Sequence, residues 1–148
     1  MNTESIATLA AQWKSVCQGF STTDLNDTFQ FIQAHSEALV IEFYKNMMLE
    51  KEASYFLSDD IVQNRLTKTL NQWLIECFNA PFQRNFAELT EKQQTVGKVH
   101  ARIGIPSWLI MRGVREIEKK VFSLQSEALQ PESHAFSMTC YIFQVLGF

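Results

Sequence analysis

The chain is poor in glycine, proline and cysteine, and it carries no excess of basic residues. Five glycines and three prolines make up about 5% of its 148 residues, less than half of the usual share of roughly 12%. A β-sandwich or β-barrel, which needs a turn every few residues, is therefore disfavoured. The three cysteines, at positions 17, 77 and 140, are too few and too scattered for a disulfide framework or a cysteine zinc site. This usage favours a reduced, cytoplasmic setting.

Charge and hydrophobic runs exclude further classes of protein. The net charge is −3, with 16 acidic residues against 13 Lys and Arg, so there is no basic stripe to neutralise phosphates and we expect no nucleic-acid partner. No apolar run exceeds four residues and the first residues lack the basic start of a signal peptide, so we expect no membrane association. The common hydrolase, P-loop and metalloprotease motifs are absent. The length suits one domain over residues 1–148.

The chain is rich in aromatic residues. Twelve Phe, three Trp and three Tyr make up 12% of the sequence, which is typical either of a well-filled core or of a core that encloses a flat apolar guest. Apolar residues recur with helical spacing from Ile6 to Phe20, which predicts a helix that ends near Gly19. A second pattern runs from Leu25 to about Leu49 and predicts one long helix, or two that bend near residues 35–36.

Further helices follow to the end of the chain. A cap at residues 58–60 precedes a pattern that we expect to stop at Asn79-Ala80-Pro81, and another helix is expected over about 86–103. Pro106 and Pro131 suit the starts of the last two helices. The sequence therefore predicts an all-α protein of six to eight helices with no strand.

Two groups of charged residues have simple structural interpretations. Asp59 and Asp60 are expected to begin a helix rather than to act as a catalytic pair. The cluster of Glu116, Glu118, Lys119 and Lys120 is expected to form a solvated helix face.

The histidines and one tyrosine are the candidates for chemistry. His35 and His134 lie in polar company and are expected at the surface. His100 lies on a semi-apolar face near a helix C-terminus, where it is either a satisfied core histidine or an imidazole with one nitrogen free to bind iron. Tyr44 is either a core tyrosine whose hydroxyl reaches the surface or a phenol directed into an apolar cavity, where its hydroxyl would need a partner.

Four stretches of sequence together resemble a known family. They are Ile41-Glu42-Phe43-Tyr44, Phe56-Leu57-Ser58, Leu66 with Trp73, and Val99-His100-Ala101-Arg102-Ile103-Gly104-Ile105-Pro106. They resemble the haem-binding domain of bacterial globin-coupled sensors, in particular the sensor domains of oxygen-regulated diguanylate cyclases, over about residues 35–110. The stretch that begins at His100 is the most specific.

The resemblance implies an all-α, globin-like helical sandwich with an additional N-terminal helix around one b-type haem (iron protoporphyrin IX). His100 corresponds to the proximal ligand of the haem iron, and Tyr44 to the distal residue that donates a hydrogen bond to O2. Leu66 corresponds to an apolar residue that limits the access of water, and Thr69 lies where some members carry a second hydrogen-bonding hydroxyl. Phe43, Leu70 and Trp73 complete the expected haem pocket.

The resemblance also implies partners and a role. Family members form homodimers through the helices at about 107–124 and 132–148, where Phe122, Phe136 and Phe143 would lie. The expected ligands are O2, and also CO and NO. By their positions, Lys98 and Arg102 are either partners of the haem propionates or simply solvated. No GGDEF-type sequence occurs in the chain.

We therefore expect a sensor domain, itself not an enzyme, that forms the N-terminal part of a longer protein. That protein is expected to be a diguanylate cyclase, which makes cyclic di-GMP from two GTP. Two alternatives remain open: a haem enzyme that turns over NO or peroxide, and a haem-free globin-like signalling module.

Overall fold

The computed structural model describes residues 3–58, 60, 65–127 and 132–146. These residues form six α-helices and one short 3-10 turn, and they contain no strand, as the sequence predicts. The elements are α1 (Thr3–Gln18), α2 (Thr22–Met47), η1 (Ala53–Tyr55), α4 (Thr67–Gln83), α5 (Phe86–Ile103), α6 (Ser107–Glu127) and α7 (Glu132–Leu146).

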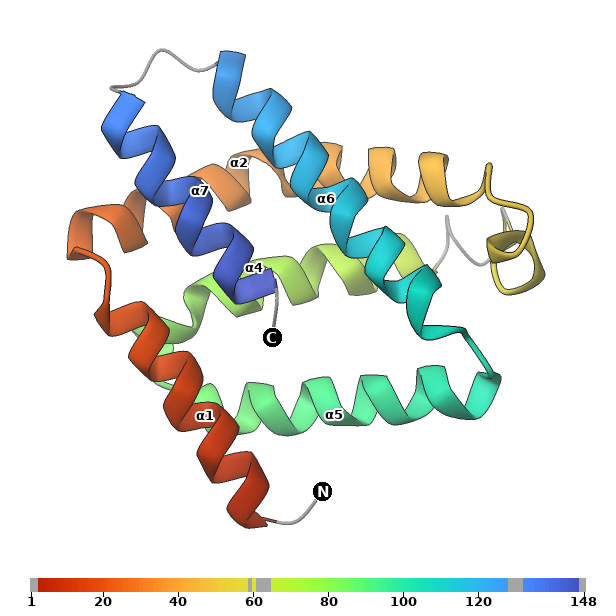
Figure 1. The fold of residues 1–148 in the computed structure, drawn as a ribbon, viewed down its shortest axis with the longest axis horizontal. Helices are drawn as coiled ribbons and strands as arrows, with labels where there is room; N and C mark the ends of the chain where they lie inside the picture. Colours follow the sequence, from red (N-terminus) through yellow and green to blue (C-terminus); the bar gives the residue numbers. More distant parts are fainter. Residues whose placement is uncertain (1–2, 59, 61–64, 128–131, 147–148) are drawn as a thin grey trace.

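The helices pack in two crossing layers (Figure 1). α6 and α7 lie side by side and both contact α2, which packs along α4 on its other side. α5 runs below α4 in the view of Figure 1 and packs mainly against α4 and α1, and α1 also contacts α7. This arrangement is a helical sandwich with an extra N-terminal helix, in agreement with the fold expected from the sequence.

The first two helices follow the sequence pattern closely. α2 is one continuous helix without the possible break near residues 35–36. It begins after Ser21, whose side-chain oxygen accepts a hydrogen bond from the backbone N–H of Asp24 at 3.0 Å, which is an ordinary N-cap. Towards the end of α2, Val40 is fully buried whereas Ile41 is 55% exposed.

The predicted stop of the next helix at Pro81 is wrong. α4 continues through Pro81 to Gln83 and ends at Arg84, whose φ of 54° lies in the left-handed region. Proline in the last turn removes a single backbone donor, and this loss is small beside the packing of a helix that buries Phe78 and Ala80. Residues 59, 61–64 and 131, on which the expected starts of two helices partly rest, lie outside the described residues, although Asp60 itself is helical.

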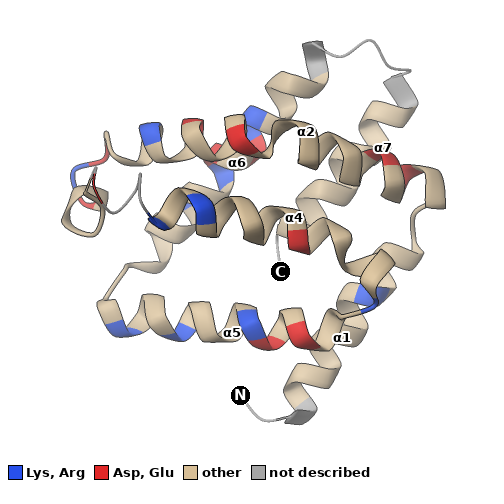
Figure 2. Ribbon diagram, turned by 180° about the vertical axis from the view of Figure 1, so that it is seen from behind, with Lys and Arg blue, Asp and Glu red and all other residues tan. Residues whose placement is uncertain are grey.

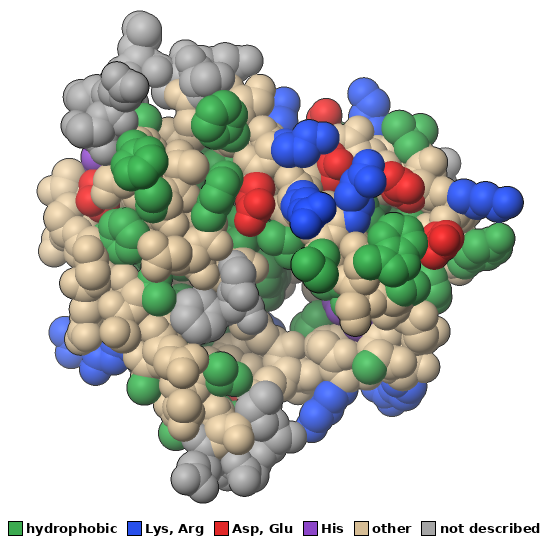
Figure 3. Space-filling view, in the orientation of Figure 1, with side chains coloured by type: hydrophobic (Ala, Val, Ile, Leu, Met, Phe, Trp, Pro, Cys, Tyr) green, Lys and Arg blue, Asp and Glu red, His purple; other side chains and the backbone are tan. Residues whose placement is uncertain are grey.

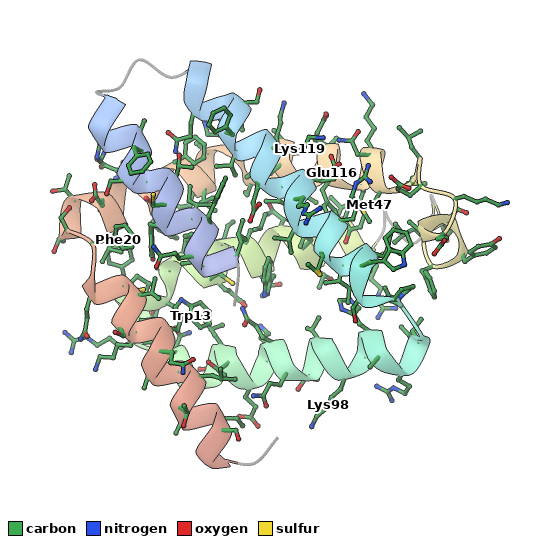
Figure 4. The ribbon with its side chains drawn as sticks, in the orientation of Figure 1. Trp13, Phe20, Met47, Lys98, Glu116 and Lys119 are labelled. Atoms are coloured by element: carbon green, nitrogen blue, oxygen red, sulfur yellow. The ribbon has the colours of Figure 1, made fainter. Side chains whose placement is uncertain are left out.

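Aromatic packing closes one end of the molecule. Trp13 of α1 is 1% exposed and its ring meets that of Phe86 in α5 edge-on, with 5.8 Å between the centroids. The ring of Phe20 lies 5.1 Å from that of Tyr141 in α7, and Tyr141 in turn meets Phe78 of α4 edge-on. Figure 4 shows Trp13 and Phe20 at this end. Within the part of the chain that the structure describes, no helix is both long and apolar enough to cross a membrane.

Candidate functional site

The two halves of α5 have different surroundings. Near the start of the helix, Phe86, Leu89 and Thr90 are buried. Near its end, Val96 is 42% exposed and Ile103 is 55% exposed, and Val99 and His100 are half-buried. These four residues are spaced at i, i+3, i+4 and i+7, so they share one face of the helix. The second half of α5 therefore carries an apolar face that the polypeptide does not cover.

A hollow lies in the surface of the molecule in this region. The space-filling view shows it between α5 and the helices that cross above it, with a histidine side chain at its edge (Figure 3). An uncovered apolar face of this kind normally marks a binding site in a monomeric protein.

His100 stands on this face with its ring available. The backbone amides of Gly104 and Ile105 both donate to the His100 carbonyl at 3.1 Å, and Gly104 ends the helix with a φ of 89°. The helix end is thus capped by backbone groups, without help from the imidazole. Among the described residues, the His100 ring has no hydrogen-bond or ion-pair partner. It is therefore not the satisfied core histidine that is the commoner alternative.

Tyr44 of α2 is a buried phenol with a partner inside the protein. Its side chain is 9% exposed, and its hydroxyl donates a hydrogen bond of 3.3 Å to the backbone carbonyl of Leu66, immediately before α4. Burial raises the pKa of Tyr44 to about 12, so the phenol keeps its proton at neutral pH. The structure therefore brings Tyr44 and Leu66 together and places the Tyr44 hydroxyl, a hydrogen-bond donor, in a largely buried position.

The other expected pocket residues lie on the same two helices. Phe43, Leu66, Leu70 and Trp73 are partly buried and pack against the main core. Thr69 is exposed, and its hydroxyl donates to the carbonyl of Arg65 one turn earlier at 3.0 Å. The Thr69 hydroxyl is thus engaged with its own helix, whereas that of Tyr44 connects two helices.

The basic residues expected near haem propionates are exposed on α5. Lys98 and Arg102 both lie at the surface, and Figure 2 shows several Lys and Arg residues along this helix. The side chain of Lys98 extends from the outer side of α5, away from the other helices (Figure 4).

A metal at this site would need ligands from a cofactor. The described residues contain no group of three or more His, Cys, Asp or Glu side chains that could hold a metal ion. A single imidazole binds iron firmly only when other donors complete the coordination, as the four nitrogens of a porphyrin do. One imidazole that has no partner among the described residues, surrounded by an apolar face, therefore fits haem better than it fits a free metal ion.

Comparison with known proteins identifies the family. Residues 21–148 match the family model described as Protoglobin. The chain belongs to the protoglobin family. Together with the globin fold, membership implies haem binding, and the resemblance to globin-coupled sensors seen in the sequence is confirmed at the level of family and fold.

The curated relatives and solved structures that this protoglobin resembles include diguanylate cyclase DosC proteins and their globin domain. This chain is 35% identical over 89 residues to diguanylate cyclase DosC of Shigella flexneri serotype 5b and to that of Escherichia coli K12. The matched residues make up 60% of this chain, but only 23% of the Shigella relative and 19% of the E. coli relative. The crystal structure of the globin domain of E. coli DosC in its ferric form matches with a TM-score of 0.88 at 23% identity, over 95% of this chain and 93% of that one. The ferrous form matches with a TM-score of 0.87.

The protoglobin chain also contains a buried carboxylate where the sequence predicts a solvated face. Glu116 of α6 is 8% exposed, and it accepts a hydrogen bond of 3.1 Å from the Asn46 side chain of α2. Its other partners are Arg112 at 3.4 Å and Lys119 at 3.5 Å on its own helix. Only the contact with Lys119 lies within the expected cluster, and α2 covers Glu116, which spacing on one helix does not reveal.

His134 lies in polar company as expected, with a side chain that is 24% exposed, and it is paired with two carboxylates. Its Nδ1 lies 3.0 Å from a carboxylate oxygen of Asp24, and its Nε2 lies 2.9 Å from one of Asp27. Both aspartates are in α2, so the ring joins the first turn of α7 to the start of α2. His35, the third histidine, is half-buried with its ring 4.6 Å from that of Phe31.

Proposed function

We propose that this protoglobin is a haem-based oxygen sensor domain that holds one b-type haem against α5 and regulates a linked output. The observation that carries the proposal is the uncovered apolar face of α5, with the imidazole of His100 at its centre and no partner for that ring among the described residues. The buried donor of Tyr44 adds the group that a gas sensor needs to distinguish its ligands.

His100 is the proposed ligand of the haem iron. The position of its ring is set by the backbone of the last turn of α5. The neighbouring apolar residues Val96, Val99 and Ile103 offer the apolar contact that a porphyrin needs. When bound, the haem supplies an iron with an open coordination position for a diatomic gas.

Tyr44 is the proposed hydrogen-bond donor to that gas. A phenol has one proton, so the hydroxyl either donates to the Leu66 carbonyl, as in this structure, or turns to the ligand. O2 gains more from the donor than CO does, because bound O2 carries more negative charge and hydrogen bonds to charged groups contribute about 1.5–3 kcal/mol. The apolar Leu66 side chain keeps water away from the same space, and Thr69 is a second candidate donor only if its hydroxyl leaves the Arg65 carbonyl.

The proposed output is diguanylate cyclase activity in a longer, dimeric protein. The relatives are named diguanylate cyclases, and this chain spans about a fifth of their length. α6 follows α5, the helix that carries His100, after the three residues 104–106. The outer faces of α6 and α7 carry large exposed apolar side chains, which a second copy would cover. They are Trp108, Ile110, Met111, Phe122 and Phe136, exposed by 48%, 40%, 57%, 64% and 71%. Phe143, also expected at this contact, instead packs against the core.

An absorption spectrum tests the haem assignment. The purified protein, reduced and then exposed to air, is expected to show a Soret band with the spectrum of an oxygen complex, and His100→Ala is expected to lose it. His35→Ala, which removes a histidine on α2, is the matched control and should keep the spectrum of the wild type. A wild-type protein that binds no haem when expressed with an adequate haem supply would contradict the proposal and favour a haem-free module.

Oxygen kinetics test the role of Tyr44. In Tyr44→Phe, the loss of the donor is expected to speed O2 dissociation by about 10- to 100-fold, with a much smaller change for CO. Equal changes for the two gases would mean that Tyr44 acts only through packing.

A further inference from the structure

The helices α2 and α6 cross at a point where only glycine fits. A Cβ atom built on Gly113 of α6 would lie 2.9 Å from Cε2 and 3.2 Å from Cζ of the Phe43 ring, and 4.0 Å from Cε of Met47. Real Cβ atoms essentially never approach another heavy atom to 2.9 Å. The Phe43 ring therefore rests directly on the backbone of α6, and a methyl group at position 113 would displace it.

The same ring supports Tyr44. The two rings meet edge-on, with 4.9 Å between centroids and an interplanar angle of 79°. Neighbouring side chains on a helix point about 100° apart, so Phe43 reaches α6 while Tyr44 reaches the Leu66 carbonyl before α4. The position of the Tyr44 ring thus depends on a neighbour that is itself held by α6.

Polar contacts fix the same crossing one turn further along. Asn46 of α2 donates to the buried carboxylate of Glu116 in α6. Arg112 lies between Glu116 at 3.4 Å and Glu50 at 2.9 Å, just beyond the end of α2. Figure 4 shows Glu116 and Met47 in this region. The two helices are therefore held in one register by a close apolar contact and by a partly buried hydrogen bond.

We propose that Gly113 is a positioning residue for the Tyr44 hydroxyl and that it acts through the ring of Phe43. The hydrogen bond that Tyr44 offers to a gas ligand then depends on how closely α6 packs on α2. Coupling of this kind is reciprocal, so a ligand that engages Tyr44 also changes the packing of α6. The inference rests on the proposed function, because it concerns the donor of the proposed haem pocket.

Substitution at position 113 in the haem-loaded protein tests the proposal. Gly113→Ala is expected to speed O2 dissociation by about fivefold, the effect of weakening one hydrogen bond, and to change CO dissociation by less than about twofold. Arg115→Ala, a truncation of an exposed side chain on the same helix α6, is the control and should leave both rates unchanged.

A smaller residue at position 43 tests whether Gly113→Ala acts through the Phe43 ring or through a general loss of structure. Phe43→Leu makes room for a methyl group at 113, so the double variant is expected to release O2 within about twofold of Phe43→Leu alone. In the haem-free protein, the loss of unfolding free energy in Gly113→Ala should likewise be largely recovered in the double variant. If Gly113→Ala slows or speeds O2 release by the same factor in both backgrounds, position 113 does not act through Phe43 and the proposal is wrong.

Hydrogen exchange provides a test that does not require Gly113→Ala to fold. Addition of O2 to the ferrous wild type is expected to change the protection of amides around residues 110–117, and the change should be absent in Tyr44→Phe. Identical responses in the two proteins would overturn the inference. If Tyr44→Phe leaves O2 dissociation unchanged, the proposed role of Tyr44 itself fails; if it speeds dissociation and a folded Gly113→Ala does not, only the role of Gly113 fails.

Discussion

The two halves of α5 show how one regular helix serves two purposes. The first half is held by the polypeptide: Phe86 and Leu89 are buried, and Trp13 of α1 packs edge-on against Phe86. The second half carries an equally apolar face, yet Val96 and Ile103 remain largely exposed. Packing of the first half fixes the position of α5. The exposed apolar face of the second half is therefore already in place for a ligand. This difference gives four predictions, from the largest expected effect to the smallest.

Trp13→Ala removes the main contact of the closed half. Loss of a fully buried tryptophan should lower the free energy of unfolding by about 3–5 kcal/mol, in the haem-free and the haem-loaded protein alike. Urea unfolding measures both values. Val96→Ala, a truncation in the open half, should cost much less in the haem-free protein; an equal loss in the two variants would abolish the distinction between the halves.

Haem addition should stabilise the open half in particular. At free haem about a thousandfold above its dissociation constant, the unfolding free energy should rise by about 4 kcal/mol. Hydrogen exchange should show new protection at residues 93–104, with little change at 86–90. New protection that is confined to the first half would place the ligand elsewhere.

Two glycines of the open half provide a matched pair. Gly104 and Gly97 both have free space for a Cβ atom, but only Gly104 has a left-handed backbone, with φ of 89°. Gly104→Ala should therefore destabilise the protein by about 1 kcal/mol. Gly97→Ala, within a regular helix, should stabilise it by about 0.5–1 kcal/mol. Thermal unfolding of the two variants measures both effects, and changes of the same sign would show that backbone conformation does not decide the outcome.

The smallest effect concerns pH and the start of α2. The Ser137 hydroxyl, and then Ser21 and His134, lower the pKa of Asp24, against a smaller opposing effect of burial. A carboxyl whose pKa is lowered by folding stabilises the protein at neutral pH, and this contribution is lost as the pH falls through the pKa of the folded state. The loss should stay below about 1 kcal/mol, as is usual for pairs near the protein surface. Urea unfolding from neutral pH to about pH 3 should show a flatter acid decline in Asp24→Asn, and an unchanged decline would exclude this carboxyl as its source.

Much of the fold can be predicted from local signals. α5 runs from Phe86 to Ile103, the same bounds that the periodic pattern predicts, because an apolar stripe and a terminal Gly-Ile-Pro both act within a few residues. The stop at Pro81 fails for a related reason: the local penalty of proline is real, but packing of distant helices against Phe78 and Ala80 outweighs it.

The candidate site divides in the same way. The proposed roles of His100 and Tyr44 come from the resemblance of their stretches of sequence to a known family, because helical spacing alone leaves a core histidine and a core tyrosine as alternatives. Other contacts join residues that are far apart in the sequence. The hydrogen bond from Tyr44 to the Leu66 carbonyl spans 22 residues, and the one from Asn46 to Glu116 spans 70. The contacts of His134 with the two aspartates span 107 residues or more. No local pattern encodes them, because they depend on which helices cross and in which register.

The amino-acid sequence by itself determined the helices and their apolar faces, because these follow from periodicity and short motifs. Its resemblance to a known family indicated the two side chains of the proposed haem pocket. Only the tertiary structure decided that half of one apolar face stays uncovered, and that Phe43 rests on the backbone at Gly113 beside Tyr44. Whether a face is covered depends on the paths of helices far apart in the chain, which are set by the packing of the whole core.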